Sequence, residues 1–304
     1  MAIMRSNIAQ RVKGQLWRRG LSTHQAIVAS SFGPPEVLKL ETVARPAPSS
    51  GQVLVKMYAA GVNPSDTYVR LGPHGPWAAT PHLLPSPPFT PGKDGAGIVE
   101  EIGGGVSGLA VGERVYTTGS VSGTSAEFAV CNADTVWPLP ARVSFAQGAC
   151  VGVPCATAYR ALVLRCAAKS GEAVFIHGAS GAVGLAATQL AAGMGCTVIG
   201  TAGTAAGEAA IAALGATPVN HRTNDYLESA KAALPAHTDG LFDVVLEMAA
   251  HANLLADVSV LRHAGRVAII GSKPLPIEFN PRLLMPKEIS VHGVFLPASP
   301  CVPD

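Results

Sequence analysis

The chain has 304 residues, of which 48% are hydrophobic and 14% charged, and its formal net charge is +2. This length favours two domains, and this composition supports a large buried core and excludes wholesale disorder. A net charge so close to zero gives no reason to expect nucleic acid as the main partner. The six cysteines form no CxxC pair, so free thiols in a reducing compartment are expected rather than a disulfide framework.

Residues 1–22 form an N-terminal extension that carries five basic residues and no acidic one. Ile3, Ile8, Val12 and Leu16 are spaced to form one face of a helix. A basic, amphipathic and acid-free segment is typical of a mitochondrial transit peptide, and an extension without a targeting role is the alternative. The extension therefore leaves both the cytoplasm and the mitochondrion open as locations.

Residues 23–147 consist of short apolar segments between turn signals, and they predict an all-β domain. The segment Leu71–Pro91 contains seven prolines, which predicts an irregular surface loop over a site. We expect strands at residues 26–30, 37–40, 53–60, 97–102, 114–118, 126–130 and 135–139.

Residues 148–296 alternate between strand and helix patterns, which predicts right-handed βαβ units and a doubly wound parallel sheet. A first helix is expected at residues 145–161, with Pro154 near its start or at a kink. The stretch Ala173–Gly207 lacks charged residues, but its glycines favour a buried βαβ unit over a membrane span. We expect strands at residues 173–177, 197–201, 218–220, 242–247, 266–271 and 289–296, and helices at 185–194, 205–214, 226–233 and 254–261.

The chain is organised around Ala173–Gly184, which reads AVFIHGASGAVG. A strand, a glycine turn and a helix are the context that a dinucleotide fingerprint requires, and Ala179 begins the pattern A-x-G-x-x-G here. Gly181 lets the backbone approach a pyrophosphate, and Gly184 lets the helix pack close to the strand. The N–H groups at the helix N-terminus then attract the phosphates. Plain helix–sheet packing is the alternative explanation of the small residues, and we favour cofactor binding.

The position that selects between NAD and NADP carries no acid. An acidic residue about 20 residues past the glycines binds the ribose 2′-hydroxyl of NAD. Here that place holds residues 201–204 (TAGT), and no acidic residue lies between Glu172 and Glu208. A 2′-phosphate is therefore not repelled, which favours NADP(H). The stretch itself offers no Lys or Arg, but His221 and Arg222, just after the next predicted strand, are placed to reach this region.

Several stretches together resemble one known family. They are FGPPEVLKLE, GVNPSDTYVR, PFTPGKDGAGIVEEIG, HGASGAVG, GTAGT, NHR and GRVAIIGS. Through them, residues 25–296 resemble the quinone oxidoreductases of the medium-chain dehydrogenase/reductase superfamily, which are of the ζ-crystallin type. The resemblance implies a GroES-like β domain and a Rossmann domain, with NADPH as cofactor and quinones or related conjugated carbonyls as substrates.

The resemblance also assigns roles to single residues. It implies that Asn63 donates to an oxygen that gains negative charge, and that Tyr68 donates a proton or binds the cofactor. Without the resemblance, Asn63 is a turn former before a proline and Tyr68 is a packed aromatic. Asp66 and Arg70 are spaced for a local ion pair, either fixing this segment or solvated at the surface. The implied cofactor residues are Tyr68, Ser180, Gly181, Ala182, Val183, Gly203, His221, Asn253, Gly271, Ser272, Lys273, Val294, Phe295 and Leu296.

A catalytic zinc is not expected. The zinc enzymes of the same superfamily carry a cysteine where Asn63 stands here and a histidine where Lys93 stands. Neither residue is a usual zinc ligand, and the cysteines and nine histidines do not cluster along the chain. The reaction is then expected to depend on placing the nicotinamide against an acceptor that is already electrophilic.

The C-terminal part departs from the family. Relatives continue past the strand at 289–296 with helices and a closing strand, whereas here a short divergent tail, 297–304, follows. We therefore expect the closing segment to be missing and a sheet edge to be exposed, through which relatives form dimers. An NADPH-binding but catalytically impaired structural or regulatory protein is the alternative to an active enzyme. RNA binding is a third possibility, supported only by family analogy.

Overall fold

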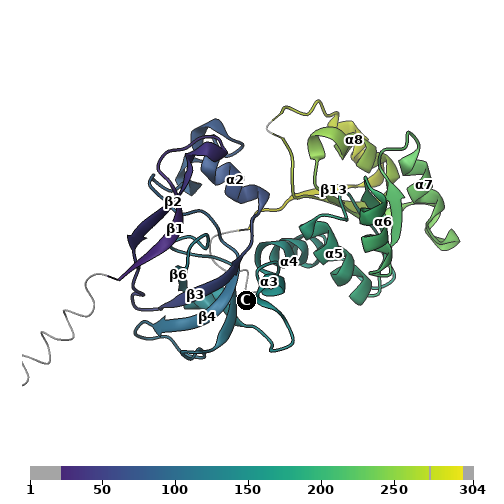
Figure 1. Cartoon of the computed structure of the whole chain (residues 1–304). Coiled ribbons are helices and arrows are strands. Elements are labelled where there is room, and N and C mark those ends of the chain that lie inside the picture. The colour runs from purple at the N-terminus through teal and green to yellow at the C-terminus, as the bar shows by residue number, and fades with distance from the viewer. Residues whose placement is uncertain (1–21, 274, 297–304) are drawn as a thin grey trace, which may run out of the picture. The chain divides into compact units, whose positions relative to one another are not determined.

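In the computed structural model, residues 22–273 and 275–296 are described, and the chain divides into two compact units between Ala149 and Cys150 (Figure 1). Each unit has its own sheet and its own hydrophobic core. The predicted combination of a β domain with a parallel α/β domain is thereby confirmed. The basic N-terminal segment up to residue 21 and the tail 297–304 lie outside the described residues.

The first unit is built on a five-stranded antiparallel sheet in the order β6-β3-β4-β5-β7. Its core forms because alternate residues of the central strands point to one face, where Val53, Val55 and Val99 are buried. A separate antiparallel pair is formed by β1 and β2. The strands are β1 (Thr23–Ala29), β2 (Leu38–Ala44), β3 (Gln52–Ala60), β4 (Gly95–Ile102), β5 (Arg114–Thr117), β6 (Phe128–Asn132) and β7 (Val136–Pro138).

The prediction that this unit is all-β is wrong at Pro64–Leu71, which forms the helix α2. Asn63 is its N-cap, and the N–H of Asn63 donates to Oδ2 of Asp66 at 2.8 Å. Pro64 occupies the first helical position, where its missing N–H costs nothing. The N-P-S-D sequence is thus a helix start, and the predicted ion pair is absent, because Arg70 Nε donates to the Gly33 carbonyl at 3.1 Å.

The proline-rich segment after α2 is irregular, as predicted. Its regular structure consists of two single 3-10 turns, η2 (Gly72–His74) and η3 (Pro81–Leu83). Prolines favour such turns because they remove backbone donors that a longer helix needs. The other 3-10 turns of this unit are η1 (Pro35–Val37) and η4 (Ala133–Thr135).

The second unit is a six-stranded parallel sheet in the order β10-β9-β8-β11-β12-β13. All four residues of the central strand β8 (Ala173–Ile176) are buried, because separate apolar clusters cover the two faces of the sheet. The other strands are β9 (Thr197–Ala202), β10 (Thr217–Asn220), β11 (Phe242–Glu247), β12 (Leu261–Ile269) and β13 (Ser290–Gly293). The connecting helices are α5 (Ala182–Gly193), α6 (Ala205–Ala212), α7 (Tyr226–Ala232) and α8 (Ala250–Val260), with 3-10 turns η6 (Ala236–Thr238), η7 (Pro281–Leu283) and η8 (Met285–Lys287).

Several predicted boundaries are wrong. The helix expected at 145–161 is divided into α3 (Phe145–Gly148) and α4 (Gly152–Tyr159), and α4 continues as one π-helical stretch, η5 (Arg160–Arg165). Pro154 lies in the first turn of α4, where a backbone N–H is not required. In addition, α8 begins at Ala250 rather than at residue 254, and β13 ends at Gly293 rather than at residue 296.

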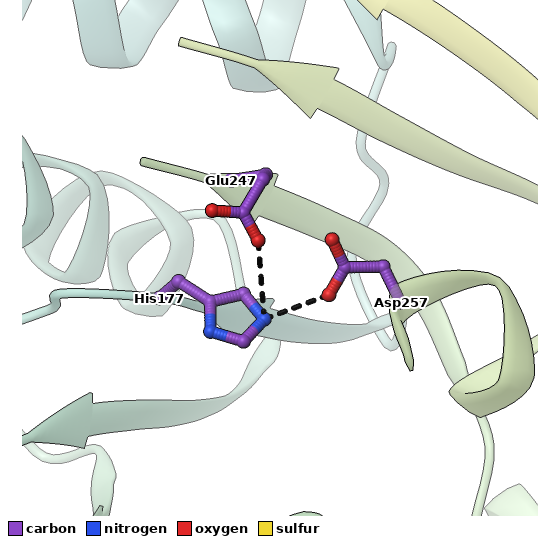
Figure 2. Close-up of side chains that lie close together, drawn as sticks. All are labelled: His177, Glu247 and Asp257. Atoms are coloured by element: carbon purple, nitrogen blue, oxygen red, sulfur yellow. Dashed lines mark hydrogen bonds and ion pairs between the residues drawn. The ribbon is translucent and has the colours of Figure 1, made fainter. Parts of the chain in front are cut away.

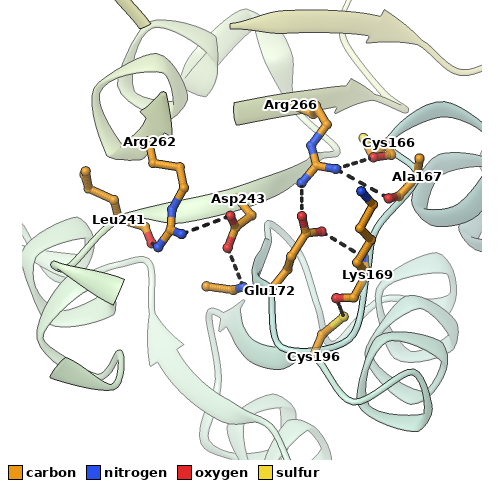
Figure 3. Close-up of polar contacts among 10 residues, drawn as sticks. Cys166, Ala167, Lys169, Glu172, Cys196, Leu241, Asp243, Arg262 and Arg266 are labelled. Atoms are coloured by element: carbon orange, nitrogen blue, oxygen red, sulfur yellow. Dashed lines mark hydrogen bonds and ion pairs between the residues drawn. The ribbon is translucent and has the colours of Figure 1, made fainter. Parts of the chain in front are cut away.

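Arginines pair with acids at the amino edge of the parallel sheet, which is the edge where its strands begin (Figure 3). Arg266 donates to Oε1 of Glu172 at 2.7 Å and to the Cys166 carbonyl at 2.7 Å. Asp243 pairs with Arg262 at 3.3 Å and accepts the N–H of Ala173 at 2.8 Å. Glu172 and Asp243 therefore each have a cationic partner at this edge.

No helix among the described residues is long and apolar enough to cross a membrane. The described cysteines are free thiols, as predicted, and Cys301 lies outside the described residues. Burial raises the pKa of Cys131 to about 11 and that of Cys166 to about 12, so both thiols stay protonated at neutral pH.

Candidate cofactor and active site

A tight turn, the glycine elbow (residues 177–184), leads from β8 into α5. Gly178 has a φ of +59°, in the left-handed region that favours glycine. A Cβ on Gly184 would lie 2.4 Å from the Gly178 carbonyl oxygen and 2.5 Å from Cα of Ala179, so close packing requires glycine there. A Cβ on Gly181 would come within 4 Å of one described atom, the Gly178 carbonyl oxygen at 3.3 Å. Packing therefore constrains position 181 much less than position 184. The bare backbone at 181 leaves space in which a bound ligand can approach the turn.

Backbone and side-chain bonds join the glycine elbow to the end of β9. The hydroxyl of Thr201 accepts the N–H of Gly178 at 2.9 Å, and its carbonyl accepts the N–H of Ala179 at 2.9 Å. The predicted pyrophosphate residues Ser180, Gly181, Ala182 and Val183 therefore stand in a rigid turn at the start of α5, with Gly181 as its N-cap. The unsatisfied N–H groups of such a start attract anions.

The structure brings Gly203, His221 and Arg222 together next to this turn. A Cβ on Gly203 would lie 2.9 Å from Nε2 of His221 and 3.0 Å from Nε of Arg222. Both side chains are exposed, and they follow β10, which pairs with β9. The position predicted to select the adenosine ribose thus combines a glycine with an imidazole and a guanidinium.

The residues predicted for the nicotinamide side lie at the carboxyl edge of the same sheet, where its strands end. Asn253, near the start of α8, donates from Nδ2 to Oε1 of Glu247 at 3.3 Å. The N–H of Gly271 donates to the Glu247 carbonyl at 3.2 Å, and the N–H of Lys273 donates to Nδ1 of His251 at 3.2 Å. The other predicted residues of this group follow β12 or β13: Ser272, Val294, Phe295 and Leu296.

Three buried ionisable residues, the carboxyl-edge triad, meet just behind these positions (Figure 2). His177 follows β8, Glu247 ends β11 and Asp257 lies on α8. Nε2 of His177 lies 2.7 Å from Oδ1 of Asp257 and 3.5 Å from Oε2 of Glu247. Both acidic side chains are fully buried, and the histidine side chain is 5% exposed.

Burial dominates the electrostatics of the triad. It raises the pKa of both Glu247 and Asp257 to about 7. Burial lowers the pKa of His177, against the attraction of Glu247, so the imidazole is favoured in its neutral form. Oε1 of Glu247 accepts the N–H of Ala249 and the amide of Asn253.

None of the three triad residues was singled out from the sequence. One usable signal was that His177 and Glu247 each stand at the carboxyl end of a predicted strand, where ligand sites of open α/β sheets gather. Asp257 carries no such signal, because its place depends on the rotation of α8.

The two predicted catalytic residues lie in the first unit, on α2. Nδ2 of Asn63 donates to Oδ2 of Asp94 at 2.9 Å, and both residues are buried. Since an amide nitrogen carries two protons, this bond fixes the orientation of Asn63 without using its full donor capacity. The Tyr68 ring packs edge-on against Trp77, with centroids 6.2 Å apart.

A cavity of about 520 Å³ opens beside α2 in the first unit. Its lining is largely apolar, with Val69, Phe89 and the prolines of the 85–91 segment. Asp66 and Lys93 are among its polar lining residues, and Nζ of Lys93 lies 5.4 Å from the centroid of Trp77. Burial raises the pKa of Asp66, while the charge of Lys93 acts against this shift. The combination of an apolar wall with few polar groups is typical of small-molecule sites.

The elbow, the parallel sheet and the β domain define a nucleotide-binding oxidoreductase of the alcohol dehydrogenase type. The profile of the alcohol dehydrogenase GroES-like domain matches residues 49–141, and that of the zinc-binding dehydrogenase family matches residues 182–304. Within this class the chain belongs to the quinone oxidoreductase family, as its relatives establish.

Three of these relatives are mammalian proteins. The quinone oxidoreductase of Mus musculus is 44% identical over 92% of this chain and 82% of its own length. That of Lama guanicoe is 47% identical over 90% of this chain and 80% of its own length. The Homo sapiens protein is 43% identical, with 91% and 82% covered. The resemblance predicted from the sequence motifs is therefore confirmed.

Solved structures of the same superfamily share the fold. An alcohol dehydrogenase superfamily protein from Novosphingobium aromaticivorans matches with a TM-score of 0.78 and 30% identity, over 90% of this chain and 79% of its own. A quinone oxidoreductase of Pseudomonas syringae matches with a TM-score of 0.74 and 29% identity, over 89% and 81% of the two chains.

Proposed function

We propose that this oxidoreductase passes reducing equivalents from NADPH to quinones or related conjugated carbonyls, without a metal. The observation that carries the proposal is the glycine at 181, which no packing contact requires and which keeps a backbone cradle open at the start of α5. The identity of 43–47% to quinone oxidoreductases over about nine tenths of the chain supports the acceptor class.

The residues of the second unit fit a pyridine nucleotide. In the proposed complex, Ser180, Gly181, Ala182 and Val183 bind the pyrophosphate through the N–H groups at the start of α5. Asn253, Gly271 and Lys273 hold the nicotinamide side from the carboxyl edge, together with Ser272, Val294, Phe295 and Leu296. When bound, the nicotinamide supplies a hydride, and the chain supplies position and exclusion of water.

NADPH is preferred over NADH in this proposal, because no acid stands at residues 201–204 and the guanidinium of Arg222 and the imidazole of His221 stand near Gly203. An acid here would bind the ribose 2′-hydroxyl of NADH and repel the 2′-phosphate of NADPH. The guanidinium of Arg222 suits a phosphate, since its fork of N–H donors matches the phosphate oxygens.

The cavity beside α2 is the proposed acceptor site. Its volume of about 520 Å³ lies within the range of small-molecule pockets, roughly 300–1,000 Å³. Its apolar wall suits the ring of a quinone, and the Lys93 ammonium suits an oxygen that gains negative charge during reduction. Asn63 and Tyr68 do not line this cavity, whereas Asp66 and Val69 of α2 do. Asn63 and Tyr68 are the proposed donors to the acceptor, and Asp94 keeps the Asn63 amide oriented.

We further propose that the chain associates with itself through β13, one of the two edge strands of the parallel sheet among the described residues. An edge strand presents unpaired N–H and C=O groups, which a second copy can pair. RNA is not part of the proposal. The net charge of +2 means that basic residues barely outnumber acidic ones, whereas binding to the phosphate backbone depends on an excess of basic residues.

The test measures binding and turnover separately. NADPH titrated against the purified chain should quench protein fluorescence at micromolar concentration, with at least tenfold weaker binding of NADH. Oxidation of NADPH should accelerate with an ortho- or para-quinone and persist after exhaustive chelation. Binding without turnover would overturn the enzymatic part, and equal affinity for NADH would overturn the assignment of NADPH.

The proposed preference for NADPH can be tested with two arginine variants, one at the proposed 2′-phosphate site and one control elsewhere. Arg222→Met should weaken NADPH binding about tenfold and leave NADH binding unchanged, since only NADPH carries the 2′-phosphate. Arg142→Met removes another arginine, one that lies in the first unit, and should change neither affinity. An equal loss for both nucleotides in Arg222→Met would show that this guanidinium does not read the 2′-phosphate.

A further inference from the structure

The carboxyl-edge triad differs from the amino edge of the same sheet in how its acids are neutralised. At the amino edge, Glu172 and Asp243 each pair with an arginine. At the carboxyl edge, Glu247 and Asp257 are both fully buried, and the basic group that meets them is the imidazole of His177. With both acids ionised and a neutral imidazole, two negative charges would share an apolar core, which is strongly unfavourable.

Two buried oxygen atoms indicate where a group that neutralises the charge of the two acids must lie. Oε2 of Glu247 and Oδ2 of Asp257 have no hydrogen-bond partner among the described residues when both acids are ionised. The other oxygen of each acid is engaged, Oε1 by Ala249 and Asn253 and Oδ1 by His177. A side-chain hydrogen bond joins Glu247 to Asp257, and a proton on Oε2 makes Glu247 its donor, so one proton serves both acids. Figure 2 shows the second oxygen of Asp257 on the side that faces Glu247.

A metal ion is the competing neutralising group, because the ligand atoms of the three residues all lie within 4.8 Å of one another. The distance of 2.7 Å between Nε2 of His177 and Oδ1 of Asp257 disfavours it. Two ligands bound to one tetrahedral zinc at its usual bond lengths stand about 3.3 Å apart. A separation of 2.7 Å is that of a hydrogen bond to a charged acceptor.

The triad is connected to the predicted nicotinamide side through Glu247. Its side chain binds the N–H of Ala249 and the amide of Asn253, at the start of α8. Its backbone carbonyl accepts the N–H groups of Ile270 at 2.8 Å and Gly271 at 3.2 Å, at the end of β12. One residue thus holds both segments that border this side of the site.

We propose that Glu247 is a neutral carboxylic acid that shares its proton with Asp257 and positions the Asn253 amide for the nicotinamide side. Glu247 is a positioning residue in this scheme, and its role in turnover rests on the function proposed above. His177 donates from Nε2 to the ionised Asp257, which in turn accepts the proton of Glu247. No electron transfer is involved, and the proton stays within the triad during catalysis.

The scheme has a pH dependence whose sign follows from the groups around Glu247. Those groups are His177 after β8, Asp257 on α8 and Tyr226 on α7, whose own pKa is raised by burial and by the two acids. Loss of the shared proton leaves two carboxylates in contact, and their repulsion displaces Oε1 from Ala249 and Asn253. Activity therefore falls as the pH rises through about 7, where burial places the pKa of the Glu247–Asp257 pair.

The kinetic experiment uses the full chain with NADPH and a quinone between pH 6 and 9. Wild type should lose kcat/KM for NADPH by several-fold above neutral pH. Glu247→Gln keeps a donor and an acceptor without a titrating proton, so its kcat/KM should be nearly independent of pH and within about threefold of wild type at pH 6. Glu247→Ala should be about tenfold lower than wild type at pH 6, as expected for loss of a buried hydrogen bond. The same pH-dependent fall in wild type and Glu247→Gln would overturn the positioning role.

A second readout needs no cofactor. The infrared carbonyl band of a buried protonated carboxyl group should be present in wild type at pH 6, weaken as the pH rises, and be absent in Glu247→Gln. Absence of this band in wild type, or one equivalent of tightly bound zinc that Glu247→Ala loses, would overturn the shared proton. If wild type fails to bind NADPH while the band is present, the proposed function and the positioning role fail but the shared proton stands.

Discussion

Gly181 and Gly184 stand three positions apart in the glycine elbow, and substituting them should have opposite effects on stability and binding. A Cβ at 181 would lie 3.3 Å from one atom, the Gly178 carbonyl oxygen, whereas a Cβ at 184 would lie 2.4 Å from that oxygen and 2.5 Å from Cα of Ala179. We therefore predict that Gly181→Asp keeps or raises the stability and abolishes NADPH binding. Gly184→Ala should lower the stability of the second unit.

The stability effects follow from local structure. Gly181 is the N-cap of α5, with φ −82° and ψ 170°, a conformation open to any residue. An aspartate there accepts free N–H groups and interacts favourably with the helix dipole, which stabilises by about 0.3–1 kcal/mol. Gly184→Ala forces the backbone apart, and such overpacking costs about 1–3 kcal/mol. For a unit of this size the midpoint of thermal unfolding should fall by roughly 2–4 °C per kcal/mol.

The binding effect is electrostatic and steric. A carboxylate about 4 Å from a phosphate charge is repelled by about 4 kcal/mol at an effective dielectric constant near 20. This energy corresponds to nearly a thousandfold loss of affinity, since each 1.4 kcal/mol is a factor of ten. Gly181→Asp should therefore show no NADPH-dependent fluorescence quenching at concentrations that saturate wild type.

The assay pairs thermal unfolding with NADPH titration, and Gly193→Ala on the same helix is the control. A Cβ at 193 meets no described atom within 4 Å, so this variant should bind NADPH normally and be at least as stable as wild type. Wild-type affinity in Gly181→Asp would refute the assignment of the elbow to phosphates. A loss of stability in Gly181→Asp as large as in Gly184→Ala would refute the packing argument.

Three further predictions concern ionisable residues. Arg266→Met should destabilise the chain by about 1–3 kcal/mol in urea unfolding, between the values of exposed and buried pairs, because it leaves the half-buried Glu172 carboxylate without the cation 2.7 Å away; an unchanged midpoint would contradict this. Lys93→Met should raise KM for the quinone several-fold at an unchanged dissociation constant for NADPH, and a change confined to NADPH would place Lys93 elsewhere. The pKa of Glu247 rises from 4.5 to about 7 on folding, so the native state keeps a proton that the unfolded chain releases. Relative to Glu247→Gln, wild type should lose about 1.4 kcal/mol of unfolding free energy per pH unit across this interval, and parallel curves would be inconsistent with the raised pKa.

The order of elements in the parallel sheet could be predicted because local signals agreed with one another. An apolar run from 173 and the small residues after it specify β8 and the start of α5, and the structure has both. The alternation that follows leaves little choice of topology, because parallel strands require crossover helices. The carboxyl edge, and with it the position of the cofactor residues, follows from the same rule.

The short helix α2 and the triad were missed for different physical reasons. Residues 64–71 bury one side chain, that of Asp66, so they lack the apolar periodicity by which helices are recognised. The triad joins residues 80 positions apart, His177 and Asp257, and its geometry depends on the phase of α8. The sequence predicted that α8 starts at residue 254, whereas it starts at Ala250. With its first turn missing, the sequence pattern did not show which face of α8 is buried, and so did not place Asp257 there.

Thr201 binds the backbone of the glycine elbow through its hydroxyl and its carbonyl, and this has a consequence for redesign. These bonds hold the end of β9, which precedes the residues proposed to select the nucleotide, against the elbow proposed to bind its phosphates. Gly200 allows β9 to pack closely against the elbow, since a Cβ at 200 would lie 2.6 Å from the Cβ of Ala179. Redesign of the proposed coenzyme preference should therefore keep residues 200 and 201, which hold the elbow in place. Substitutions at 203, 221 and 222 are expected to change the preference while the affinity for the phosphates is retained.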